Sequence, residues 1–517
     1  MRLTTPFAHL QAVPLRTPFP GWRAHVNAAQ WSETFSRVRA TGGRLVALWG
    51  SDERRHAGGF AVHAALHVPE GLLTLSLPLA DTPPRYPDVA RVFPAAGRMQ
   101  RAVYDLLGIV ADGAADVRPW LRHAAWPEGT HPLRKDFPLE ARYPNALDDY
   151  AFVRVAGDGV HEIPVGPVHA GTIEPGHFRF SVVGEKILRL EERLGYKHKA
   201  IEKLFETKTV EEGVTLAARV SGDATVAYAW AYCMAAESAA RTQIPPRAAW
   251  LRGLALELER IANHLGDLGY LGNDVALAFG FAQFWRLKEE LLRTNAELFG
   301  HRYLMDLVVP GGVARDMPLK GPGKLLGLCE RLAVEVESLR SIYDEHPGVQ
   351  DRYVACGRVP PALAEQLGLT GLAGRASGLA WDLRVQFPVP PYDLLDVQMA
   401  THRNGDVAAR VAVRFDEVQE SLRLVRELLE NVPGGRIREE LGAVDPGAFG
   451  VGWVEGWRGE VLVALHVGEG GRIHRCHPHD PSWQNWPVLE HAVLGNIVPD
   501  FPLINKSFNL SYSGHDL

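Results

Sequence analysis

Cysteine is scarce in this chain of 517 residues. Its four cysteines, Cys233, Cys329, Cys356 and Cys476, are isolated, and no two of them form a C-x-x-C pair. Disulfide frameworks and cysteine-ligated clusters need several closely spaced cysteines. The sequence therefore argues against both within this chain and favours a reducing compartment.

Long apolar runs and an excess of positive charge are also missing. No run approaches the ~20 apolar residues of a membrane-spanning helix, and the first residues lack the pattern of a signal peptide. A formal net charge of -6 offers no basic surface for nucleic acid. We therefore expect a cytoplasmic, multidomain protein that reaches a membrane only through partner subunits.

The first part of the chain alternates short apolar runs with glycine and proline. Arg44–Trp49, Gly59–Val68 and Leu72–Leu77 have the composition of strands, and a helix is expected over Met99–Leu107. This pattern predicts an N-terminal α/β domain.

From about Ile163 onward the pattern becomes helical. Apolar residues recur every three or four positions over Leu251–Leu268, Leu328–Leu339 and Val411–Leu429, which predicts three long amphipathic helices. Pro433-Gly434-Gly435 is expected to end the third. Helices with such stripes pack into a bundle.

The C-terminal part is expected to return to strands at Gly450–Trp453 and Glu460–His466, before a helix near Trp486–Leu494. The segment 474–479, with three histidines and a cysteine, is interpreted as a structural strand, since only alternate side chains of an extended segment converge. The predicted fold class is α+β, with an N-terminal α/β domain followed by a mainly α-helical domain with small β elements.

Two motifs in the first part, Tyr104–Ile109 (YDLLGI) and Trp126–Asp136 (WPEGTHPLRKD), resemble the signature of the 30-kDa peripheral subunit of respiratory complex I. The resemblance implies that residues 1–145 form a domain of that type.

Three further motifs follow in order: Ile163–His169 (IPVGPVH), Glu174–Arg179 (EPGHFR) and Tyr196–Leu204 (YKHKAIEKL). They resemble the start of the large subunit of group 4, formate hydrogenlyase-type, nickel-iron hydrogenases and of the 49-kDa subunit of complex I. Residues 155–517 are accordingly expected to form a domain of this kind, fused to the first.

In the hydrogenases, Arg-Val-Cys-Gly-x-Cys and Asp-Pro-Cys-x-x-Cys supply four thiolates to nickel and iron. Here Ser221 and Ala224 follow Arg219-Val220, and Ser511 and Gly514 follow Asn509-Leu510. Alanine and glycine offer no side-chain ligand, serine stays protonated, and these metals prefer thiolates. The resemblance thus implies the variant found in energy-converting-hydrogenase-related complexes, with no metal in this chain and no hydrogen turnover.

The resemblance also implies roles for three side chains. In the hydrogenases a glutamate just before Gly-His moves protons at the metal site, and Glu174 and His177 hold this position. Arg458 matches an arginine that overhangs the metal site and would hold an anionic or carbonyl-bearing ligand. Two alternatives stay open: Glu174 and His177 brace a β-turn, and Arg458 forms a structural ion pair with Glu455 or Asp382.

Complex I uses the equivalent cavity as a quinone site, and its quinone-contacting tyrosine aligns with Gly222, although its partnering histidine has no clear counterpart here. The segment Gly374–Arg384 matches both families and is interpreted as architecture first and cavity lining second, with Asp382 and Arg384 paired. The candidate acceptor-binding residues are His169, Gly222, Asp223, Asp382 and Arg384.

The leading hypothesis is an oxidoreductase subunit, similar to those of NADH-quinone oxidoreductases, on the cytoplasmic side of the inner membrane. It would bind no cofactor of its own, but would form a quinone-type acceptor cavity beside the 4Fe-4S cluster of a complex I 20-kDa-like small subunit. A ferredoxin-like subunit and antiporter-like and anchor membrane subunits would complete the complex and couple electron transfer to ion translocation. No nucleic acid is expected.

The alternative is a non-catalytic scaffold subunit. The two hypotheses differ in the state of the cavity between Glu174, Gly222, Arg458 and Ser511. An acceptor site needs an open, polar cavity, whereas a scaffold is compatible with one filled by Tyr512 and Phe508.

Overall fold

The computed structural model describes residues 3, 6–56, 58–80, 83–170 and 173–517. The N-terminal unit is a five-stranded sheet of order β1-β2-β5-β4-β3, in which only β2 and β5 are parallel. The predicted strands and helix are all present. The elements are β1 (Val13–Pro14), β2 (Gly21–His25), α1 (Ala28–Ala40), β3 (Arg44–Asp52), β4 (Phe60–Val68), β5 (Gly71–Leu79), β6 (Arg85–Pro87), α2 (Ala96–Leu107) and β7 (Val110–Asp112).

A second, antiparallel sheet of order β10-β9-β8 begins the rest of the chain. Its strands are β8 (Val160–Val165), β9 (His177–Val183) and β10 (Lys186–Arg193). The expectation of a helical pattern from Ile163 onward is wrong over these residues. Phe178, Phe180 and Val182 alternate with less buried residues, which is the period of a strand.

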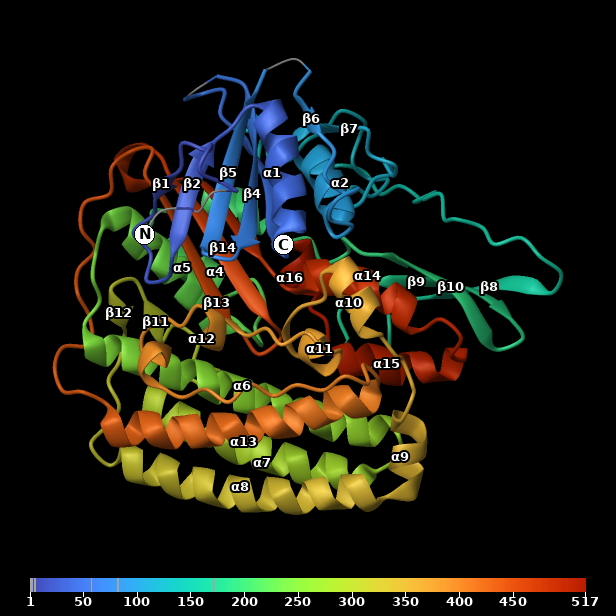
Figure 1. Cartoon of the computed structure of the whole chain (residues 1–517), viewed down its shortest axis with the longest axis vertical. Helices are drawn as coiled ribbons and strands as arrows, with labels where there is room; N and C mark the ends of the chain where they lie inside the picture. Colours follow the sequence, from blue (N-terminus) through green and yellow to red (C-terminus); the bar gives the residue numbers. More distant parts are fainter. Residues whose placement is uncertain (1–2, 4–5, 57, 81–82, 171–172) are drawn as a thin grey trace.

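Long helices form the lower half of the molecule in Figure 1. The three predicted stripes lie in α6 (Pro246–Asp274), α8 (Gly321–Glu345) and α13 (Val407–Asn431), and α13 ends just before Pro433. The other elements of this part are α3 (Ile201–Phe205), α4 (Gly213–Ala217), α5 (Thr225–Ala240), α7 (Ala278–Phe299), β11 (Val308–Val309), β12 (Gly312–Val313), α9 (Pro347–Tyr353), α10 (Pro361–Leu367), α11 (Gly371–Ala376) and α12 (Leu383–Gln386). None of the described helices combines the length and the apolar character needed to cross a bilayer.

The C-terminal part is a three-stranded antiparallel sheet followed by short helices. These elements are β13 (Phe449–Glu455), β14 (Glu460–Val467), β15 (Ile473–His479), α14 (Ser482–Ala492), α15 (Phe501–Phe508) and α16 (Tyr512–Asp516). Helix α5 packs directly on β13. A Cβ atom at Gly450 or Gly452 would lie 1.9 Å from the carbonyl oxygen of Ala235 or Ala231, so only glycine permits this approach.

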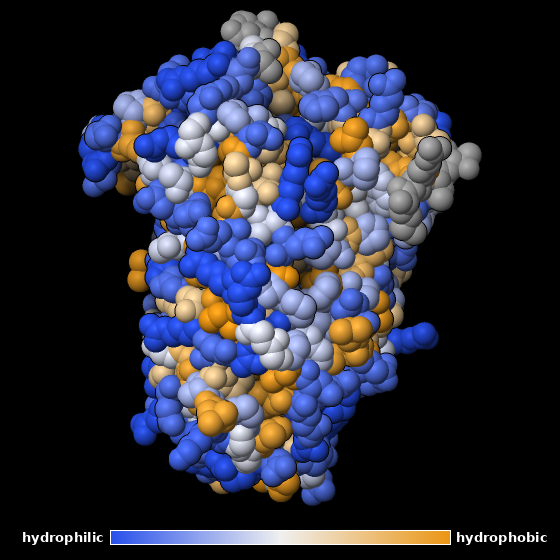
Figure 2. All heavy atoms as spheres, turned by 90° about the vertical axis from the view of Figure 1, so that its left-hand side faces the viewer, coloured by the Kyte–Doolittle hydropathy of each residue, from blue (hydrophilic) through white to orange (hydrophobic). Residues whose placement is uncertain are grey.

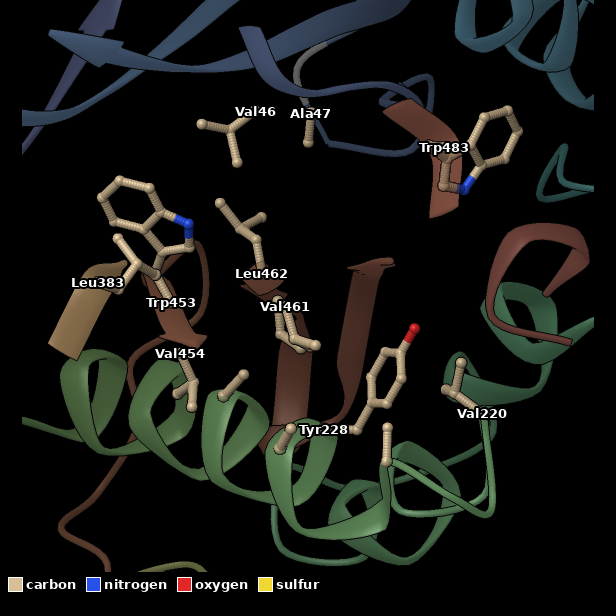
Figure 3. Close-up of a cluster of buried hydrophobic side chains, with 14 of the residues drawn as sticks. Val46, Ala47, Val220, Tyr228, Leu383, Trp453, Val454, Val461, Leu462 and Trp483 are labelled. Atoms are coloured by element: carbon tan, nitrogen blue, oxygen red, sulfur yellow. The ribbon is translucent and has the colours of Figure 1, made fainter. Parts of the chain in front are cut away.

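The N-terminal sheet and the C-terminal sheet share one hydrophobic core. Figure 3 shows Val46 and Ala47 of β3 above Leu462 of β14 and Trp453 of β13, with Tyr228 of α5 below. Two polar contacts join the same surfaces: Gln484 Nε2 donates to the Val46 carbonyl (2.6 Å) and Arg475 Nε donates to the Gly50 carbonyl (2.8 Å). The two predicted domains are therefore packed together over a continuous buried surface.

A network of buried charges joins α6, α11, α13 and β13. Arg375 of α11 donates to Glu417 (2.9 Å) and to Glu455 (2.8 Å). Arg384 binds Asp382 (2.7 Å) and Glu257 (3.1 Å). Each of these side chains is almost completely buried, so each charge depends on a partner of opposite sign.

Replacing Arg375 by methionine tests this dependence. Arg375→Met leaves Glu417 and Glu455 without their shared cation, so we expect the free energy of unfolding to fall by about 3–5 kcal/mol, measured by urea titration. The control is Arg293→Met, which removes an exposed pair with Glu289 on α7 and should change it by less than about 1 kcal/mol. Equal effects of the two substitutions would contradict the structural role of the network.

Candidate functional site

A cavity of about 520 Å³ lies between the second sheet, the start of α5, the end of α6 and the helices α15 and α16. Glu174, Gly222, Arg458 and Ser511 all line it. Tyr512 forms part of the wall, with its ring against Trp486 (4.8 Å between centroids). Phe508 is buried elsewhere, under the guanidinium of Arg410. The cavity is therefore open, and neither aromatic ring fills it.

An ion pair between Asp223 and Arg458 forms the polar centre of the cavity. Asp223 stands just before α5, and Arg458 lies in the turn between β13 and β14. Arg458 Nη1 donates to Asp223 Oδ1 (3.1 Å), Nη2 donates to Oδ2, and Nε donates to the Asn509 carbonyl. The guanidinium also lies 4.0 Å from the ring of Trp457. These bonds leave other N–H groups of Arg458 to reach a ligand.

The pairing sets the charge of both groups. Burial alone would raise the pKa of Asp223, but the charge of Arg458 and hydrogen bonds from Arg458 and Ser221 bring it below its ordinary value. Burial alone would lower the pKa of Arg458, but Asp223 raises it. The expected alternative partners of Arg458, Glu455 and Asp382, instead bind Arg375.

Three further contacts hold the Asp223 loop in place. Trp457 Nε1 (2.8 Å) and Asn263 Nδ2 (2.7 Å) donate to the backbone carbonyl of Asp223. Ser221 Oγ donates to Asp223 Oδ1 (2.7 Å). The loop is therefore held by a side chain of α6, by a side chain of the β13–β14 turn and by its own Ser221.

The positions at which the hydrogenase resemblance places thiolates come together beside this ion pair. Ser221 Oγ lies 3.0 Å from Ser511 Oγ, although the two residues are far apart in the chain. Ser511 also caps α16, since its Oγ accepts a hydrogen bond from the Gly514 N–H (2.9 Å). Ala224 is buried at the start of α5.

The space beside Gly514 is occupied by a carboxylate. A Cβ atom at Gly514 would lie 2.3 Å from Asp480 Oδ2. That oxygen accepts a hydrogen bond from Tyr228 Oη (2.7 Å), and Asp480 Oδ1 accepts one from the Ser482 N–H (2.8 Å). With no thiolate in the set and Asp480 in the fourth position, these residues do not fit a nickel-iron centre. The four cysteines of the chain are all buried at other positions.

Of the predicted site residues, Glu174 and His169 line the cavity, but His177 does not. Glu174 accepts a hydrogen bond from the Ser513 N–H (3.0 Å), and its side chain is 36% exposed. His177 is on the opposite face of β9 from Phe178, which does line the cavity, because neighbours on a strand point to opposite faces. The His177 ring packs near Phe152 and its Nδ1 lies 3.1 Å from the Gly166 carbonyl. His177 therefore lies outside this cavity.

Asp382 and Arg384 also lie outside the cavity. They form the expected pair, but within the buried network of Glu257 and Arg375. The segment is architectural, and neither residue lines this cavity.

Sequence reasoning missed Glu259, a buried carboxyl group next to the Asp223 loop. Its oxygens accept hydrogen bonds from the first N–H groups of α5, at Val226 (2.6 Å) and Ala227 (3.2 Å). Burial, only partly offset by these bonds, raises the pKa of Glu259 to about 8. The signal was present in the sequence, since Glu257, Glu259 and Arg260 interrupt an otherwise apolar part of α6.

The histidines of β15 each have a separate partner. His474 contacts Glu53 (2.9 Å), His477 contacts Glu202 (2.7 Å) and His479 contacts Gln484 (3.1 Å). Over the described ranges, no group of three or more His, Cys, Asp or Glu side chains is placed to hold a metal ion.

Comparison with known proteins agrees with the order of the two predicted parts. The family model of the 30 Kd subunit of respiratory-chain NADH dehydrogenase matches residues 24–143, and that of the 49 Kd subunit matches residues 274–448. Formate hydrogenlyase subunit 5 of Escherichia coli (strain K12) is 34% identical over 483 residues, which cover 92% of this chain and 85% of that protein. NADH-quinone oxidoreductase subunit 4 of Thermus thermophilus is 28% identical over 377 residues, covering 68% of this chain and 92% of that one.

The fold is shared with a solved respiratory complex. A chain of the membrane-bound sulfane sulfur reductase, described as an archaeal respiratory membrane complex, superposes with a TM-score of 0.66 at 24% identity. The match covers 70% of this chain and 100% of that chain. The α+β prediction, with an N-terminal unit of the 30-kDa kind followed by one of the 49-kDa kind, is confirmed.

Gly222, which lines the cavity, and Gly514, which lies against Asp480, give a matched test of the packing around the site. Neither has a positive φ. Gly514→Ala would press its Cβ against Asp480, so we expect a loss of about 1–3 kcal/mol in the free energy of unfolding. Gly222→Ala would place its nearest neighbour, Met305 Cε, at 3.7 Å and should change stability by less than about 0.5 kcal/mol.

The Gly514 effect should be coupled to Asp480. In a double-mutant cycle by urea titration, Gly514→Ala should cost less in the Asp480→Ala background than in the wild type. Additive effects would show that Asp480 does not occupy the space beside residue 514.

Glu259→Gln tests the buried carboxyl group. Because the pKa of Glu259 is raised in the folded protein, the folded state binds more protons than the unfolded state between about pH 4.5 and pH 8. Wild-type stability should therefore fall, relative to Glu259→Gln, as pH rises through this window. Urea titrations of both proteins at several pH values measure the difference, and a constant difference would contradict a protonated Glu259.

Proposed function

The chain belongs to the family that unites the large subunit of formate hydrogenlyase-type hydrogenases with the 30-kDa and 49-kDa subunits of respiratory NADH dehydrogenase, and from this premise we propose that it is the acceptor-binding subunit of a membrane-associated oxidoreductase complex. The proposed acceptor is a quinone. Electrons would arrive from a 4Fe-4S cluster in a complex I 20-kDa-like small subunit, supplied through a ferredoxin-like subunit. Antiporter-like and anchor subunits would hold the complex at the cytoplasmic side of the inner membrane and translocate ions.

The observation that carries this proposal is the open cavity around the Asp223–Arg458 pair. Its volume of about 520 Å³ lies within the range of small-molecule sites. Val165, Ile173, Phe178 and Phe501 supply apolar walls. The lining also holds a hydrogen-bonded polar group made of Ser221, Asp223, Arg458 and Ser511. An acceptor with an apolar body and a carbonyl headgroup suits a cavity that combines apolar walls with polar groups.

Several residues of the cavity would each have a separate role in the two-electron, two-proton reduction of the quinone. Arg458 would donate a hydrogen bond to a quinone carbonyl, which stabilises the negative charge that develops on that oxygen. Ser221 and Ser511 can donate or accept hydrogen bonds within the same hydrogen-bonded group. Glu174, partly exposed at the rim, is placed to exchange protons with water.

The open cavity supports this role over that of a pure scaffold. Burying Arg458 beside Asp223 has a desolvation penalty that only their pairing offsets. A scaffold without a ligand would be more stable with apolar side chains packed at these positions.

Filling the cavity tests the proposal without breaking the ion pair. Gly222 lines the cavity, and a Cβ atom there meets only Met305 Cε, at 3.7 Å, so the large side chain of Gly222→Trp should obstruct the acceptor. In the purified complex with its iron-sulfur clusters chemically reduced, added quinone should remove the cluster signal in electron paramagnetic resonance. We expect Gly222→Trp to slow this reoxidation by at least about tenfold, the effect of ~1.4 kcal/mol on a barrier.

The matched control is Gly323→Trp, at a glycine of α8 where an added side chain meets open space. It should leave the rate unchanged. Equal rates in all three proteins would place the acceptor elsewhere, and no reoxidation of the wild type by any quinone would favour the scaffold role.

A further inference from the structure

A second cavity lies at the opposite end of α5 from the proposed acceptor site. Its volume is about 660 Å³, and it shares no lining residue with the first cavity. It is formed by the last turns of α5, the first turns of α6, the loop around Pro390 and residues 16–18. Figure 2 views the molecule from the side on which β1, β11 and β12 lie in Figure 1.

The walls of this second cavity are largely apolar and aromatic. Trp230 and Met234 of α5 form one side, and Trp250 of α6 forms another. Leu394, at the rim, is 70% exposed. Such walls favour a ligand with a flat, apolar body.

The polar groups of the cavity favour an anion. The guanidinium groups of Arg16 and Arg241 have no hydrogen bond or ion pair with any residue that the structure describes. The third arginine, Arg252, is neutralised by Glu237, which it binds at 2.6 Å and 3.0 Å. The remaining carboxylate is Asp393, so the lining keeps a net positive charge.

Two features of the backbone and side chains add to this preference. Helix α6, 29 residues long, begins at the cavity with Pro245 as its N-cap and no side-chain cap. Its first N–H groups therefore lack acceptors within the helix, at the positive end of its dipole. Ser238 lines the same cavity, is only 8% exposed, and its hydroxyl group has no hydrogen-bond partner among the described residues.

We propose that this second cavity binds a small organic anion with an aromatic body. The acidic group would lie between Arg16, Arg241 and the start of α6, and the body would lie against Trp230 and Trp250. The proposal does not depend on the acceptor site, because the two cavities are separate.

The test uses two fluorescent probes with the same aromatic body on the full-length chain. The anionic probe is 8-anilinonaphthalene-1-sulfonate, and N-phenyl-1-naphthylamine lacks its sulfonate. We expect saturable binding of the anion, weakened roughly tenfold in Arg16→Ala/Arg241→Ala, and roughly tenfold weaker binding of the neutral probe by the wild type. The neutral probe should not respond to the arginine substitutions.

Two control variants test whether the anionic probe binds in the second cavity and not elsewhere on the protein. Arg39→Ala/Arg426→Ala removes two exposed arginines that do not line the cavity and should leave binding of the anion unchanged. Gly222→Trp, which obstructs the acceptor cavity, should also leave it unchanged. Binding of the anion that is absent, equal to that of the neutral probe, insensitive to Arg16 and Arg241, or lost in Gly222→Trp would overturn the proposal.

Discussion

Helix α5 packs so closely on strand β13 that two glycines of the strand touch the helix backbone. All sixteen residues of this helix are buried, and the sheet of β13 to β15 in turn packs on the N-terminal sheet. The ends of α5 are therefore fixed in space. The Asp223 loop stands at one end and meets Arg458 from the turn that follows β13, so the same packing that builds the core also brings the ion pair together.

Buried charge is the second organising force, and in the network around Arg375 it acts through pairs of opposite charges. Arg375, Arg384 and Arg414 have less than a twentieth of their surface exposed, and each has a carboxylate partner. The Asp223–Arg458 pair differs because it faces a cavity, with 38% of the Asp223 side chain exposed. The interior network fixes the structure, whereas the pair at the cavity keeps polar surface available to a ligand.

Sequence patterns predicted the elements that have one clear periodicity. The stripe of Leu251–Leu268 anticipated α6, and the strands of the N-terminal sheet followed from their apolar runs. Helix α5 was missed because it is buried on every side and so has no stripe. The sheet of β8 to β10 was missed although Phe178, Phe180 and Val182 alternate as a strand requires.

The candidate site was predictable in outline but not in its pairings. Motif resemblance located Glu174, Gly222, Asp223 and Arg458, which do line one cavity. Nothing local in the sequence pairs Arg458 with a residue 235 positions away, or Ser221 with Ser511. Such facts depend on how distant segments pack, which one sequence does not reveal.

The carboxylate of Asp480 beside Gly514 couples two distant positions of the chain. Any side chain introduced at residue 514 meets this carboxylate, whose Oδ2 accepts a hydrogen bond from Tyr228 and whose Oδ1 accepts one from the Ser482 N–H. A thiolate at residue 514 would therefore need a second substitution that moves or removes the carboxylate, so the two positions can change only together.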